Sequence, residues 1–172
     1  FPNPDQIKWC YSSIPLPAFK SIFGEPNRIS KTRYMTQLSY VLESETEPKS
    51  LVEVLYQKDS LRAIQYHDCS TANERLKQKF GYNSSKGHYE SKFGVGEESE
   101  IGKCLIGTDS THFDDLVGRP DITDRVNFRW VYFTKPRASG QSEAAVPRLE
   151  LNFDESWKLK SMSFHLGVNF QH

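Results

Sequence analysis

The sequence predicts an α+β fold made of two tandem repeats, each a short helix followed by an antiparallel meander of about three strands. Two observations predict this fold: segments recur in the same order at a nearly constant offset, and the segments after each helix alternate apolar and polar residues. We expect the meanders to lie side by side as one curved sheet with helices on one face. The 172 residues suit one domain, or two small halves sharing one core.

The recurring segments form two blocks. Residues 10–27 match residues 104–121 at an offset of 94, which aligns a cysteine, a phenylalanine and a Gly-x-Pro sequence. Residues 52–67 match residues 149–165 at offsets of 97 to 98, and the small drift falls in loops, which tolerate insertions. Two matches in the same order favour an internal duplication over a chance alignment of generic helix ends and hairpins.

Each repeat opens with a predicted short helix, Ala18–Phe23 in the first and Thr111–Val117 in the second. Asp109 or Ser110 can cap the free backbone amides at the start of the second helix. Gly118 suits the left-handed position at which helices end, and the proline two residues later prevents the helix from continuing.

Strands are predicted after each helix because these segments are rich in β-branched and aromatic residues. In the clearest one, Val52, Val54 and Tyr56 face one way, whereas Glu53 and Leu55 face the other. The predicted strands are Arg33–Leu42, Leu51–Gln57 and Leu61–His67 in the first repeat, and Asn127–Thr134, Arg148–Phe153 and Lys158–Leu166 in the second.

The segment between the repeats is predicted as a helix and a loop. Thr71 and Glu74 fit a capping box, which predicts a helix over Ala72–Phe80, and residues 81–102 have the composition of a long surface loop. A second long loop, residues 135–147, interrupts the second meander. The predicted organisation is a first repeat at 1–69, a linker at 70–103 and a second repeat at 104–172.

Composition excludes several classes of function. Twenty-two basic residues balance twenty-two acidic ones, so a nucleic-acid-binding surface that tracks phosphates is disfavoured. No uncharged run is long enough to span a membrane, so we expect no membrane partner.

The chain starts without Met or an apolar leader, so we expect a processed or partial chain. Three cysteines favour reduced thiols, with one bridge and one free thiol as the alternative.

Duplicated polar residues are the first candidates for a site. Glu53 and His67 in the first repeat match Glu150 and His165 in the second, and their strand parity is opposite to that of the core residues. A paired Glu/His site could perform acid–base chemistry near neutral pH. We interpret these residues instead as polar groups on the solvated face of the sheet. The sequence has no zinc spacing, phosphate loop or nucleophile elbow, so it predicts no metal, cofactor or catalytic residue.

Aromatic residues crowd the strand at 127–134, which has large apolar groups on both faces. Either Phe128, Trp130 and Tyr132 or Val131 and Phe133 are left on an open sheet face. The alternative is that a loop covers that face and the strand is buried on both sides. Exposed Trp, Tyr and Arg are typical of protein interfaces. The predicted partner-binding residues are Trp130, Tyr132, Tyr34, Glu53, His67, Glu150 and His165.

The chain resembles the superfamily of β-lactamase-inhibitor proteins and small outer-membrane lipoproteins. The resemblance is carried by residues 113–121 and 149–159, and more loosely by residues 19–27 and 52–61. It implies a layout in which two tandem copies form a concave sheet that binds a partner.

These observations predict a non-enzymatic protein-binding module of the inhibitor, immunity or assembly-factor type, which uses an open sheet face and long loops. The alternative is a small-ligand-binding protein or hydrolase with a cleft between the halves and His67 and His165 as polar anchors. A saddle-shaped nucleic-acid binder is a third possibility, which the neutral charge disfavours.

Overall fold

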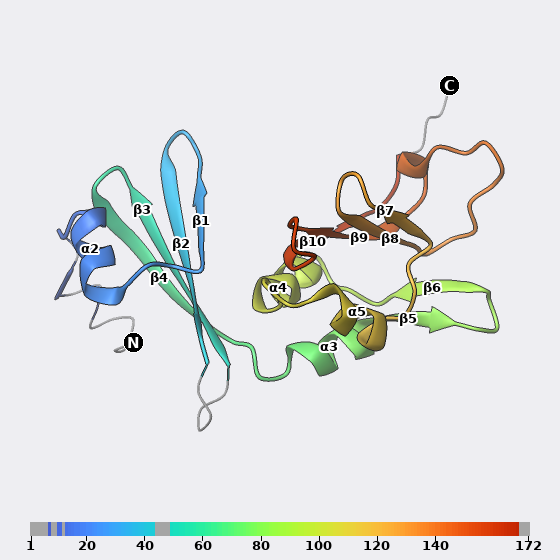
Figure 1. Cartoon of the computed structure of the whole chain (residues 1–172), viewed down its shortest axis with the longest axis horizontal. Coiled ribbons are helices and arrows are strands. Elements are labelled where there is room, and N and C mark those ends of the chain that lie inside the picture. The colour runs from blue at the N-terminus through green and yellow to red at the C-terminus, as the bar shows by residue number, and fades with distance from the viewer. Residues whose placement is uncertain (1–6, 8–9, 12, 44–48, 169–172) are drawn as a thin grey trace. The chain divides into compact units, whose positions relative to one another are not determined.

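The α+β class and the plan of a helix followed by an antiparallel meander are confirmed by a computed structural model of the chain (Figure 1). The structure describes residue 7 and the ranges 10–11, 13–43 and 49–168. The chain divides into unit 1, residues 1–70, and unit 2, residues 71–172. Each unit is described by itself below.

Unit 1 is a helix packed on a four-stranded antiparallel sheet in the order β1-β2-β3-β4 (Figure 1). The predicted helix and strands are all present, but the meander has a fourth strand, β1, which the sequence did not reveal. All four β1 residues are exposed, so β1 lacks the apolar alternation that marks the other strands. The elements are α2 (Leu16–Phe23), β1 (Arg28–Lys31), β2 (Met35–Leu42), β3 (Ser50–Gln57) and β4 (Ser60–Asp68).

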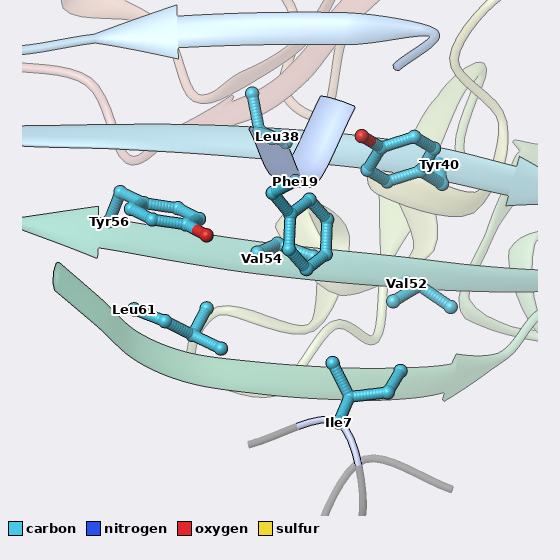
Figure 2. Close-up of a cluster of buried hydrophobic side chains, with 8 residues drawn as sticks. All are labelled: Ile7, Phe19, Leu38, Tyr40, Val52, Val54, Tyr56 and Leu61. Carbon is cyan, nitrogen blue, oxygen red and sulfur yellow. The ribbon is translucent and has the colours of Figure 1, made fainter. Parts of the chain in front are cut away.

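The core of unit 1 lies between α2 and one face of the sheet. Phe19 of α2 is fully buried and its ring centroid lies 5.8 Å from that of Tyr56, as Figure 2 illustrates. The hydroxyl of Tyr40 donates to the carbonyl of Gly24 at the end of α2, at 3.0 Å. Burial and the nearby charge of Glu25 raise the pKa of Tyr40 to about 12, so this hydroxyl keeps its proton.

Unit 2 repeats the order of helix and meander, and its four-stranded sheet has the order β7-β8-β9-β10. The two meanders therefore form separate hydrogen-bonded sheets. The elements are α3 (Ala72–Lys79), β5 (Phe80–Asn83), β6 (His88–Ser91), α4 (Glu97–Cys104), α5 (Ser110–Leu116), β7 (Ile122–Asp124), β8 (Arg129–Phe133), the 3-10 helix η1 (Glu143–Ala145), β9 (Arg148–Phe153) and β10 (Leu159–His165).

The segment predicted as a linker packs into unit 2. The helix predicted at 72–80 is α3, although the side chain of Thr71 does not cap it. The loop predicted at 81–102 is wrong, because this segment forms the β5–β6 hairpin and most of α4. The hairpin is held by aromatic packing rather than by a long apolar run: the rings of Phe80 and Tyr89 stack at 5.5 Å, and both rings contact that of Tyr132.

Helix α4 packs closely on β10 (Figure 1). Gly102 faces Met162, and a Cβ at Gly102 would lie 2.7 Å from the Cβ of Met162. Only a residue without a side chain allows this approach between helix and strand.

Gly102→Ala is therefore expected to lower the free energy of unfolding by about 1–3 kcal/mol, because the added methyl group must displace β10 or α4. Gly81→Ala is the matched control, since a Cβ there meets no atom within 4 Å. Urea unfolding of both variants measures the difference, and equal stability of the two variants would contradict the close packing.

The cysteines differ in state. Cys69 and Cys104 are disulfide-bonded, whereas Cys10 is a free thiol with an exposed side chain. The expectation of reduced thiols is therefore wrong, and the alternative with one free thiol applies.

Titration of the native, unreduced protein with a thiol reagent should give one reactive thiol per chain, because two of the three cysteines are disulfide-bonded. Cys10→Ser should give none. Three reactive thiols in the absence of a reductant would be incompatible with this assignment.

Candidate functional site

The aromatic strand β8 is covered on both faces for most of its length. Val131 and Phe133 pack against Val146, which belongs to the loop that the sequence placed at 135–147. Tyr132 points the other way and is fully buried, and its hydroxyl donates to the carbonyl of Gly118 at 3.0 Å. The alternative of a strand buried on both faces therefore holds here, and Tyr132 is a core residue rather than a surface contact.

The other predicted partner-binding residues are dispersed. Tyr34 is 64% exposed at the turn between β1 and β2, where the guanidinium of Arg33 lies over its ring. Glu53 and Glu150 are only 7% and 9% exposed, so the expectation that they point to solvent is wrong. A buried carboxylate needs charged or hydrogen-bonding partners, and both residues have them.

Each buried glutamate contacts a histidine of its own unit. His67 Nε2 lies 3.2 Å from Glu53 Oε1 in unit 1, and these two atoms are in contact without hydrogen-bond alignment. Gln37 also donates to the carboxylate of Glu53. In unit 2, His165 Nε2 lies 3.4 Å from Glu150 Oε2. The sequence favoured separate solvated residues over a paired Glu/His arrangement, whereas the structure brings each glutamate into contact with a histidine.

Glu150 is the centre of a larger charge network in unit 2. Arg148 Nε donates to Glu150 Oε1 at 2.9 Å, and Arg129 Nη1 donates to the same oxygen at 3.0 Å. Arg129 also donates to Glu143 of η1 and lies 3.6 Å from a carboxylate oxygen of Asp124. The network therefore ties η1 and the turn after β7 to the sheet.

The protonation of Glu150 follows from these contacts. Burial raises its pKa most strongly, but the hydrogen bond from Arg148 and the surrounding positive charges together outweigh burial and lower it. A general acid at neutral pH needs a raised carboxyl pKa, so this glutamate is tuned in the opposite direction. Its contacts identify it as a structural anion.

Glu150→Gln should lower the free energy of unfolding at pH 7 by about 2–4 kcal/mol, because it removes one partner of a buried charge network. A carboxylate with a lowered native pKa contributes stability above its unfolded pKa of about 4.3, and that stability is lost as the pH falls through the native pKa. The gap between wild type and variant should therefore close below pH 4.

Urea unfolding at a series of pH values measures this gap, and the exposed Glu155→Gln is the control for a generic loss of charge. A gap that stays constant from pH 7 to pH 3 would contradict the role given to Glu150.

The remaining predicted residue, Trp130, lines a cleft of about 430 Å³ in unit 2. Trp130 shares a sheet face with Tyr132, but Tyr132 is fully buried whereas Trp130 is half-buried. The cleft is lined by Ser110, Thr123, Arg125, Trp130 and Trp157.

Trp157 is held in the turn between β9 and β10. Asp154 Oδ1 accepts the backbone N–H groups of Ser156 and Lys158, at 2.8 and 3.0 Å. The N–H of Trp157 donates to the carbonyl of Asp154, and its own carbonyl accepts the N–H of Ser110 at the start of α5, both at 2.9 Å. These hydrogen bonds therefore fix the backbone from which the Trp157 indole projects.

Phe128 lies at the end of the turn between β7 and β8. As at Asp154, an aspartate holds this turn: Asp124 Oδ1 accepts the backbone N–H groups of Val126 and Asn127. Phe128 has φ 52° and Trp157 has φ 58°, so the backbone of both residues is in the left-handed conformation. For a bulky residue this conformation costs about 1–3 kcal/mol of folding free energy. Their ring centroids lie 5.2 Å apart.

The rings at this edge form a cluster around Phe153, which is nearly fully buried. Its centroid lies 5.2 Å from that of Trp130 and 5.6 Å from that of Trp157. The two indoles are thereby braced by one core residue. The sequence predicted the strands on either side of the 154–157 turn but did not indicate Trp157 or Arg125. An aromatic residue directly after an Asp-initiated turn is the signal that could have found Trp157.

No protein-family model, curated protein or solved structure matches the chain. The resemblance to the inhibitor and lipoprotein superfamily therefore stays a prediction. Within the part of the chain that the structure describes, no helix is long and apolar enough to cross a membrane.

Proposed function

We propose that this protein binds another protein, and that the tryptophan cleft of unit 2 is the central contact. The observation that carries the proposal is a cleft walled by Trp130 and Trp157 and flanked by Arg125. Tryptophan and arginine are the residues most enriched where protein interfaces gain their free energy of binding. Both indoles are braced by Phe153, so little side-chain entropy is lost on binding.

Backbone strain supports the same conclusion. Phe128 and Trp157 occupy a conformation that suits glycine, and they lie side by side at the tips of two turns. Strain of this kind persists where function maintains it, so the two residues are candidates for a functional surface.

The alternative of a hydrolase or small-ligand binder with paired histidines has less support. His67 and His165 each contact a buried glutamate of their own unit. These contacts explain the positions of both imidazole rings without a role in binding a substrate. The same contacts, together with the equivalent hydroxyl bonds of Tyr40 and Tyr132, support the internal duplication as their common origin.

Trp157→Ala should weaken binding to the partner about tenfold or more, because it removes one wall of the cleft. The wild-type chain, Trp157→Ala and Tyr82→Ala would be immobilised and exposed to a lysate of the source organism. A protein retained in stoichiometric amount by wild type and by Tyr82→Ala, and lost with Trp157→Ala, is the expected result. Tyr82 is a suitable control because it is an exposed aromatic residue of unit 2 that does not line the cleft.

The affinity of each chain for the purified partner would then be measured by calorimetry, with urea unfolding to confirm that both variants fold. Equal affinity of all three folded chains would remove the cleft from the binding surface.

A further inference from the structure

We propose that the cleft takes an acidic segment of the partner, with an apolar side chain packed against the indoles of Trp130 and Trp157 and a neighbouring carboxylate on Arg125. This inference rests on the proposed function and specifies the chemistry that the cleft recognises. Three observations support it: the charge of the lining, the state of Arg125 and the hydrogen-bonding groups of the walls.

The described residues that line the cleft include one cation and no anion. Arg125 is the charged residue, beside two indoles and the hydroxyl-bearing Ser110 and Thr123. An aromatic cleft can also hold a cation against the faces of its rings. Here the guanidinium would repel such a ligand at close range, so charge complementarity favours a carboxylate over an ammonium group.

Arg125 is available for this contact. Its neighbour Asp124 already accepts hydrogen bonds from Asn127 and pairs with Arg129, which together lower the pKa of the Asp124 carboxyl. Among the residues that the structure describes, Arg125 itself forms no ion pair. Arginine binds carboxylates through two parallel N–H donors, so an exposed unpaired arginine beside an apolar cleft suits a carboxylate next to an apolar group.

The walls also offer unused donors. The indole N–H of Trp130 is shielded from solvent and has no acceptor in the described part of the chain. A buried donor without a partner is costly, and a ligand oxygen would relieve that cost after a small movement of the ring. A volume of about 430 Å³ lies within the range of pockets that hold small ligands, which is enough for one aromatic side chain and a carboxylate.

The test uses two short peptides that differ only in charge, acetyl-Glu-Phe-Glu-amide and acetyl-Gln-Phe-Gln-amide. Each is titrated into the full ¹⁵N-labelled chain while the indole N–H signals of Trp130 and Trp157 are followed by NMR. We expect both signals to move, and the acidic peptide to bind about fivefold more tightly at low salt, with the advantage shrinking as salt screens the contact.

Arg125→Gln should abolish the difference between the peptides while leaving the affinity for the neutral peptide unchanged. Arg119→Gln removes the same charge from an exposed arginine outside the cleft and should preserve the preference. Retention of the preference in Arg125→Gln would overturn the role of that residue.

Two further outcomes overturn the inference in different ways. Equal affinity of wild type for both peptides would show that the cleft takes an apolar group without a carboxylate, and would leave the protein-binding function standing. Unmoved indole signals with both peptides would exclude this ligand chemistry for the cleft. The capture experiment with Trp157→Ala tests the protein-binding function separately, because it does not depend on the charge of the ligand.

Discussion

A single hydrogen bond, made once in each unit, fixes the position of the helix on its sheet. Tyr40 and Tyr132 each lie in the core and donate to the carbonyl of the glycine that follows a helix, Gly24 and Gly118, at 3.0 Å. A hydroxyl cannot be buried without an acceptor, so the tyrosine and the end of the helix must meet. In unit 2 this bond sets the C-terminal end of α5, while the bond from Ser110 to Trp157 sets its N-terminal end. The shape of the cleft therefore depends on the core contact at the other end of the helix.

The two faces of strand β8 carry different features of unit 2. Arg129 joins the charge network around Glu150 on one face, and the next residue, Trp130, lines the cleft on the other. The network anchors η1 and the β7–β8 turn, and that turn carries Arg125 and Phe128. The buried charges thus support the walls of the cleft, and the apolar cluster around Phe153 does the same from inside the core.

Much of this architecture could be predicted from the sequence because its signals are local. The apolar alternation that predicted a strand at residues 148–153 and the Asp109 cap of the second helix are periodic or nearest-neighbour features, and the strand and the cap are both present in the structure. The β5–β6 hairpin could not be predicted, because its strands have 4 residues each and depend on Tyr132, distant in the chain. The burial of Glu53 and Glu150 was missed because strand parity gives the direction of a side chain, not whether that face is covered.

The candidate site could be predicted only in part, because only one of its aromatic walls lies in an element with a local sequence signal. Trp130 belongs to a strand with an evident pattern, whereas Trp157 and Arg125 belong to turns, whose residues come together only through tertiary contacts. The left-handed backbone at Phe128 and Trp157 also bears on how selection acts on these turns. Glycine would suit the backbone at both positions, so selection for folding stability alone favours its replacement of the aromatic residues. Under the proposed function, stability and recognition make opposite demands at these two positions, and a chain selected only for heat resistance would lose the proposed contact surface first.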